Sequence, residues 1–256
     1  MQRVLAAGPA IKMYAPESVS TQMVHQGKRA SPTTSLSRVL RDNGLSLTLV
    51  ALFLAFWVGQ ALVGHRHYNE EHRQHGQPEV TLGAYLKSAD FMEATTENWE
   101  SEFLQMGAYV LLTCFLFQRG SSESKKIGEV EAVDRDPRRS QHKADAPGPV
   151  RRGGWALRVY ANSLSLAFLL LFLTSFILHA IAGARARNEE ALTHGAASIS
   201  TLQYLISSQF WFESLQNWQS EFLAIAAMVV LSIFLRQHGS PESKPVDAPH
   251  DQTGSD

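Results

Sequence analysis

The sequence predicts an all-α polytopic membrane protein, with four transmembrane helices arranged as two parallel-repeat helical hairpins and with short interfacial helices. Two observations favour this fold class. Long charge-free runs alternate with polar segments, and the second half of the chain repeats the first. The apolar content of 45% is ordinary for a soluble protein, so the prediction depends on where the apolar residues lie along the chain.

Two uncharged runs predict the first helix of each hairpin. They are 45–64 (LSLTLVALFLAFWVGQALVG) and 164–183 (LSLAFLLLFLTSFILHAIAG). As a helix, each would be about 30 Å long, which is enough to cross the hydrocarbon core of a bilayer. The apolar runs that follow are shorter, and they reach spanning length only if their helices begin at about residues 98 and 217. We therefore predict the second helix of each hairpin at 99–118 and 218–236.

A shift of 119 residues aligns 43–125 with 162–244 without a gap and predicts a tandem duplication. The identical residues are not confined to apolar positions, where chance matches between membrane helices are common. The recurring polar strings are Asn-Glu-Glu at 69–71 and 188–190, His-Gly at 75–76 and 194–195, and Asn-Trp-x-Ser-Glu-Phe-Leu at 98–104 and 217–223. Because each copy holds an even number of predicted spans, both copies enter the membrane from the same side and are parallel.

The duplication and the polar segments divide the chain into five parts. We predict a disordered tail at 1–37, a first membrane repeat at 38–125, a flexible linker at 126–154, a second repeat at 155–244 and a disordered tail at 245–256. Eighteen of the 23 Lys and Arg residues lie in the tails, the linker and the helix ends beside them. Since such residues favour the cytoplasmic side, we expect both termini and the linker in the cytoplasm.

Each first helix is predicted to continue beyond the membrane. An Arg and a Glu four residues apart lie on one helix face in each copy; the pairs are Arg66 with Glu70 and Arg185 with Glu189. The glycine of each His-Gly string suits the left-handed position just after a helix. A short amphipathic stretch follows, with Leu82, Tyr85, Leu86 and Phe91 on its apolar side, and is expected along the outer interface.

Glu102 and Glu221 are the principal candidate functional residues. Both are expected at or just below the outer membrane boundary, where a carboxylate is costly unless it is paired, protonated or hydrated. Counting along the helices places Arg66 at the depth of Glu102, and Arg185 at that of Glu221. Three interpretations stay open: an ion pair that docks two helices, a protonatable or cation-binding carboxylate at the mouth of a pathway, and a side chain that reaches into water.

Four further candidates mark the start of the second helix in each copy. They are Asn98, Trp99, Asn217 and Trp218, and Trp at that depth is a usual interfacial anchor. Inside the predicted spans, Gln60 and His179 occupy equivalent positions of the two copies. We expect both in the bundle interior, hydrogen-bonded across helices.

No pattern indicates a catalytic residue, a cofactor or a metal site. Four histidines lie between 65 and 75, but only His75 has a counterpart in the second copy, which favours a solvated histidine-rich loop. Haem would need facing histidines within the membrane, and only His179 lies in a predicted span. The single cysteine, Cys114, cannot form an internal disulfide. A net charge of −1 gives no indication of nucleic-acid binding.

The strings RDNGLSL, YNEEHRQHG and FMEATTENWESEFLQMGAYVLLTCFLFQRGSSESK, with their second-copy versions, resemble a bacterial membrane-protein family catalogued only as a domain of unknown function (domain of unknown function 6766). The resemblance covers nearly all of 38–125 and 157–244, as two tandem copies. It implies the bacterial cytoplasmic membrane and supplies no activity. The second copy departs from the first where Tyr68 becomes Arg187 and Gln105 becomes Ala224.

The sequence therefore leaves three functions open. The first is a non-enzymatic membrane protein that acts through packing with lipids, a second copy of itself or another membrane protein. The second is a small transporter or channel for protons, cations or a small solute, using Glu102 and Glu221. The third is a sensor of metal or envelope stress, located in the histidine-rich loop on the outer face.

Overall fold

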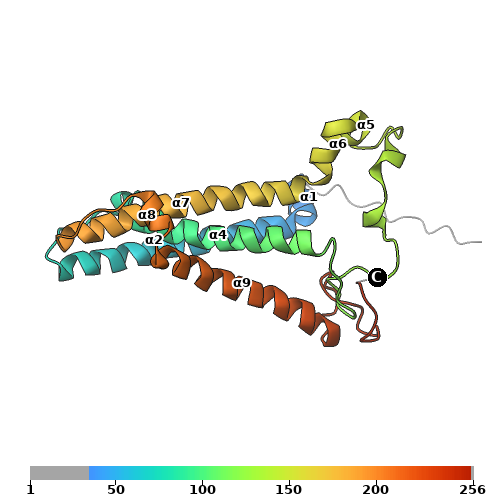
Figure 1. The fold of residues 1–256 in the computed structure, drawn as a ribbon. Coiled ribbons are helices and arrows are strands. Elements are labelled where there is room, and N and C mark those ends of the chain that lie inside the picture. Colours follow the sequence, from blue (N-terminus) through green and yellow to red (C-terminus); the bar gives the residue numbers. More distant parts are fainter. Residues whose placement is uncertain (1–34, 255–256) are drawn as a thin grey trace, which may run out of the picture. The chain divides into compact units, whose positions relative to one another are not determined.

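The computed structural model describes residues 35–254, and all regular secondary structure within that range is helical (Figure 1). The chain divides into two compact units, one ending at Ala55 and the other beginning at Phe56. The described part of the first unit consists of α1 (Ser35–Asp42) and the beginning of α2 (Gly44–Gln74). Every candidate residue named above belongs to the second unit.

The second unit contains two similar successions of a long helix, a short helix and another long helix. The first succession is the remainder of α2, then α3 (Leu82–Tyr85) and α4 (Ala89–Leu112), and the second is α7 (Ser163–Thr193), α8 (Thr201–Leu205) and α9 (Ser208–Phe234). Between them lie four short helices: η1 (Ala132–Asp134), η2 (Pro137–Ser140), α5 (Gly148–Arg152) and α6 (Gly154–Ala161).

Within the described residues, three helices rather than four are long and apolar enough to cross a membrane: α2, α7 and α9. The predicted span at 99–118, the second along the chain, is wrong. The side chain of Ser88 accepts a hydrogen bond from the backbone N–H of Phe91 and starts α4 ten residues earlier, and the helix ends at Leu112. A bilayer needs about 20 residues of helix, and any such stretch of α4 includes Glu97, Glu100 and Glu102.

The predicted extension of the first helix in each copy is confirmed. α2 and α7 continue well past their apolar runs, and the glycines after them have positive φ, 67° at Gly76 and 66° at Gly195. The recurring asparagines of these two helices form hydrogen bonds with the backbone of the segment that follows each helix. Asn188 Nδ2 donates to the carbonyl of Ile199 at 2.8 Å, and Asn188 Oδ1 accepts from the N–H of Ile199 at 2.8 Å. Asn69 forms the same pair of bonds with Val80.

α4 packs between α7 and α9. It runs antiparallel to α7, because Glu100 meets His179 while Gly107 lies against Phe168 farther along. It runs parallel to α9, where the side chain of Gln105 donates to the carbonyl of Glu221 at 2.9 Å. The charged helix α4 thus presents its polar side chains to both neighbours.

The buried apolar core is small and lies near one end of the long helices. One cluster joins Ala180, Ala184, Tyr204 and Phe210, and the equivalent cluster joins Ala61, Tyr85 and Phe91. Most large apolar side chains of α7 and α9 are exposed, among them Leu170 and Phe212. Long helices with apolar surfaces of this kind suit the lipid environment of a membrane protein.

The predicted flexible segments contain more structure than their composition suggests. Residues 1–34 of the predicted N-terminal tail lie outside the described residues, and 35–37 belong to α1. The linker contains η1, η2 and α5. The C-terminal segment folds back around the fully buried Lys244 ammonium. Its three N–H donors are shared among four carbonyls within hydrogen-bond distance, those of Gly120, Pro249, His250 and Gln252.

Candidate functional site

Glu102 and Glu221 do not form the ion pairs with Arg66 and Arg185 that the sequence suggested. Glu102, Arg66 and Arg185 are exposed and Glu221 is half-buried, and none of the four joins an ion pair with another described residue. Helix geometry explains the outward direction of Glu102. Residues two apart on an α-helix point about 200° apart, and Glu100 faces α7.

The other predicted residues divide between the two copies. Asn217 Nδ2 donates to Glu97 Oε1 at 2.5 Å, and Trp218 Nε1 donates to Glu100 Oε1 at 3.0 Å. Asn98 donates to a carbonyl of its own helix, and Trp99 is half-buried. Glu70 and Glu189 are exposed. Asn217 and Trp218 therefore contact a cluster of carboxylates on α4, none of which is a sequence-predicted site residue.

A buried carboxylate–imidazole pair forms the centre of this cluster. The side chains of Glu100 and His179 are both 0% exposed, and His179 Nδ1 lies 2.8 Å from Glu100 Oε2. This contact confirms that His179 bonds across helices. Trp218 occupies the other oxygen of Glu100, so the carboxylate accepts two hydrogen bonds. A neutral imidazole that donates through Nδ1 has a free lone pair on Nε2.

His179 Nε2 faces two further carboxylates. It forms no hydrogen bond and lies 3.6 Å from Glu213 Oε2. Ligand atoms of Glu93, His179 and Glu213 all lie within 4.8 Å of one another. The hydroxyl of Tyr204 is 2.9 Å from Glu93 Oε1 and 2.6 Å from Glu213 Oε2. A phenol has one proton, so both contacts are satisfied only when one carboxyl is protonated or a cation lies nearby.

The cluster has an excess of acidic groups. Glu93, Glu97, Glu100 and Glu213 lie around one imidazole, and no Lys or Arg of the described chain forms an ion pair with them. Glu93 lies on α4, outside the three apolar helices. Its pKa is raised to about 7, chiefly by burial; the Tyr204 hydrogen bond opposes the rise and the Glu213 charge contributes to it. Uncompensated carboxylates of this kind attract a cation.

The geometry of His179, Glu93 and Glu213 fits a metal ion. Metal–ligand bonds of about 2.0–2.2 Å place tetrahedral ligands roughly 3.4 Å apart, close to the 3.6 Å between His179 Nε2 and Glu213 Oε2. A metal-bound histidine commonly donates its other N–H to a carboxylate, as His179 does to Glu100. An imidazole with two carboxylates suits first-row divalent ions such as Zn²⁺ or Mn²⁺ better than Mg²⁺ or Ca²⁺.

A cavity of about 620 Å³ leads to Glu93. Its walls include Asp90, His75 and His194, together with several further carboxylates from the ends of α2 and α7. The rings of His75 and His194, which align at a shift of 119 residues, lie edge to face with centroids 6.0 Å apart. The cavity therefore offers an acidic, histidine-lined approach to the buried cluster.

Of the three ligands, only His179 was expected from the sequence, because Glu93 and Glu213 are not among the polar residues that recur at a shift of 119. The sequence signal for this cluster lies in the positions at which the two aligned segments differ. At the positions equivalent to the cluster's acidic residues and histidine, the other copy has a neutral side chain: Phe212 for Glu93, Gln216 for Glu97, Gln219 for Glu100, Gln60 for His179 and Ala94 for Glu213.

Comparisons with known proteins give a family without an activity. No curated protein and no solved structure is detectably similar to the chain. One family model matches residues 36–255, which include nearly every described residue. The chain belongs to that family, described as Domain of unknown function (DUF6766).

Proposed function

We propose that this chain is a membrane protein that binds a divalent transition-metal ion through His179, Glu93 and Glu213. The observation that carries the proposal is the buried Nε2 of His179, which has no hydrogen bond and faces two carboxylates that contact a single phenolic proton. A metal ion would supply the positive charge that this arrangement lacks.

The surrounding residues have distinct supporting roles. Glu100 and Trp218 hold the imidazole so that Nε2 points towards Glu93 and Glu213. Tyr204 holds the two carboxylates close together. Because ligands must be deprotonated to bind a metal, the arriving ion displaces the proton shared among these groups. Binding should therefore release protons into the solution.

We place the protein in the cytoplasmic membrane of a bacterium, with the linker and the C-terminal segment inside, because α7 and α9 between them cross the bilayer twice. The distribution of Lys and Arg along the chain supports this orientation. The cavity that leads to Glu93 then faces outwards, and its acidic walls would concentrate cations. The proposed role is non-enzymatic, since the cluster residues are engaged in holding the ion or orienting its ligands. The bilayer, a second copy or another membrane protein would be its partners.

Transport of the bound ion is a second candidate function. Polar side chains recur every four residues along α4, at Glu97, Ser101, Gln105, Tyr109 and Thr113, and so form one ridge of the helix. This ridge, rather than Glu102 and Glu221, supplies the polar path. Gln105→Leu should abolish ion uptake into proteoliposomes while binding in detergent persists. Wild-type protein that takes up no ion would remove this candidate.

The binding experiment uses purified full-length protein, freed of metal with a chelator and titrated calorimetrically with Zn²⁺ and with Mn²⁺. We expect one ion per chain, accompanied by proton release. His179→Gln should abolish binding, and the change is conservative because the first copy has Gln60 at the equivalent position. Glu102→Gln is the matched control, an exposed carboxylate on the same helix as Glu93.

Two outcomes would contradict the proposal. Wild-type protein that binds neither ion has no metal site. Binding that survives in His179→Gln but is lost in Glu102→Gln would place the site elsewhere on α4.

A further inference from the structure

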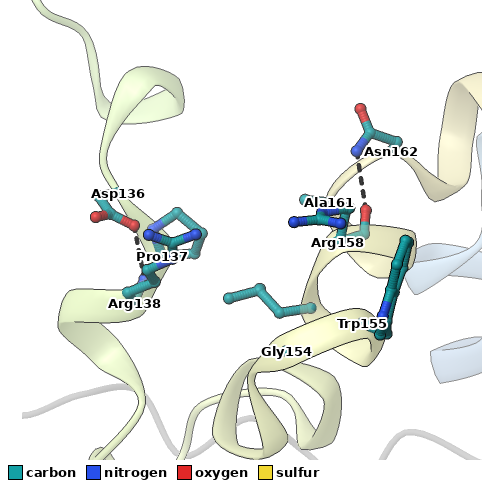
Figure 2. A pocket seen from close by; sticks show the side chains of 9 residues that line it. Asp136, Pro137, Arg138, Gly154, Trp155, Arg158, Ala161 and Asn162 are labelled. Carbon is teal, nitrogen blue, oxygen red and sulfur yellow. Dashed lines mark hydrogen bonds between the residues drawn. The ribbon is translucent and has the colours of Figure 1, made fainter.

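A second concave site lies in the linker, far along the chain from the cluster on α4. Nine residues of η2, α6 and the segments beside them line a cavity of about 450 Å³, a volume typical of small-ligand sites. Figure 2 shows Arg138 on one side of this cavity and Arg158 on the other, with Trp155 beside Arg158. This linker cavity is independent of the proposed metal site.

The two guanidinium groups of the linker cavity lack an anionic partner in the described chain. Neither Arg138 nor Arg158 forms an ion pair with a described residue. Asp136 is the one acidic residue of the lining, and its carboxylate accepts a hydrogen bond from the backbone N–H of Arg138 at 3.0 Å. Arg158 lies over the Trp155 ring, 4.5 Å from its centroid, a contact that orients the guanidinium without neutralising it.

The segment around the linker cavity is strongly basic. Residues 135–158 contain seven Lys or Arg side chains, namely Arg135, Arg138, Arg139, Lys143, Arg151, Arg152 and Arg158, against Asp136 and Asp145. This excess of positive charge attracts anionic ligands. A planar guanidinium pairs well with phosphate oxygens because it can donate two hydrogen bonds at once.

The position of the linker cavity along the chain indicates which phosphate-containing ligand is close to it. α6 ends at Ala161, and the apolar run of α7 starts at Leu164. Arg158 is six residues before Leu164 and therefore within about 20 Å of it even in an extended chain. Trp155 is 75% exposed, and an exposed Trp beside a membrane helix commonly lies at the headgroup level. The cavity thus belongs to the surface of the bilayer that α7 would enter.

We propose that the linker cavity binds the phosphate of an anionic phospholipid headgroup between Arg138 and Arg158, with Trp155 in the interfacial layer. Basic residues close to a membrane helix attract anionic lipids. The concave shape, with one guanidinium on each side, distinguishes this site from a diffuse basic surface.

The test measures lipid binding to delipidated full-length protein by native mass spectrometry. The probes are phosphatidylglycerol and phosphatidylcholine with identical acyl chains. We expect phosphatidylglycerol to bind about tenfold tighter or more, the scale of two arginines near a membrane surface. The double variant Arg138→Gln/Arg158→Gln should lose most of that preference. Arg151→Gln/Arg152→Gln is the matched control, since it removes the same charge from α5 without touching the cavity lining, and should keep the preference.

Three results would overturn the proposal. Equal binding of the two lipids by wild-type protein would mean that no anionic headgroup site exists. Equal losses in the double variant and its control would mean a diffuse basic surface instead of a cavity. Displacement of phosphatidylglycerol by an equal concentration of inorganic phosphate would mean a site for free phosphate and not for a lipid.

Discussion

Glu100→Gln tests the proposed metal site without altering a ligand. Glu100 is fully buried, and its two oxygens accept hydrogen bonds from His179 Nδ1 at 2.8 Å and from Trp218 Nε1 at 3.0 Å. A glutamine has one carbonyl oxygen, so its NH₂ group would face one of these two donors. A buried donor left unpaired costs about 1–3 kcal/mol of stability. Loss of a carboxylate behind a metal-bound histidine typically lowers metal affinity by about 10- to 100-fold.

The assay is competition between the protein and a chromophoric chelator, with Zn²⁺ and at fixed pH. Glu102→Gln, the same chemical change two residues farther on and on the exposed face, should leave the affinity unchanged. If Glu100→Gln binds Zn²⁺ as tightly as wild type while its melting temperature falls, Glu100 stabilises the helix contact only. The carboxylate–histidine–metal argument would then be refuted.

Three further predictions use the same protein. Gly183→Ala would place a methyl group 2.5 Å from Glu93 Oε1 and should lower both stability, by about 1–3 kcal/mol, and Zn²⁺ affinity. Gly64→Ala is the control, because its added methyl group would contact the hydroxyl of Tyr85, outside the cluster. Calorimetry should show a loss of stability without a change in Zn²⁺ affinity. The raised pKa of Glu93, about 7 when folded, favours the folded state fully below its unfolded pKa of about 4.5, and this contribution is lost as the pH rises through 7. With a chelator present, Glu93→Gln should therefore have a higher free energy of unfolding than wild type at pH 8, by up to about 3 kcal/mol. At pH 5 the two proteins should be equally stable. Lys244→Met leaves four carbonyls without their donor and should speed proteolysis of the C-terminal segment without changing Zn²⁺ affinity.

The sequence predicted most of the helices because their signals are local. Charge-free runs, the glycines after each long helix and the short amphipathic segments all act over a few turns. The error at α4 has a physical cause as well. The apolar run 103–117 suggested a span, but the serine cap at Ser88 starts the helix earlier and Leu112 ends it. The resulting helix is stabilised by contacts with α7 and α9, and two of its carboxylates, Glu100 and Glu97, face those neighbours.

The metal site could not be predicted from spacing. Its three proposed ligands come from α4, α7 and α9, and they are separated by dozens of residues. Only tertiary packing brings them within reach of one another. The ion pair considered for Glu102 is absent for a simpler reason, because the direction of a side chain depends on which face of α4 meets α7. A shift of two residues moves a carboxylate from the exposed face to the buried one.

Comparing the aligned segments 43–125 and 162–244 distinguishes residues that stabilise the fold from residues of the proposed metal site. Recurring residues such as Asn69 and Asn188, or Gly64 and Gly183, form the same local contacts in each aligned segment, and their recurrence is explained by stability. The carboxylates and the histidine of the cluster do not recur. Where two segments of a chain align, a buried ionisable residue whose aligned counterpart is neutral is therefore the stronger candidate for function. A stabilising role would apply equally to both aligned segments, whereas a single bound ion needs only one set of ligands.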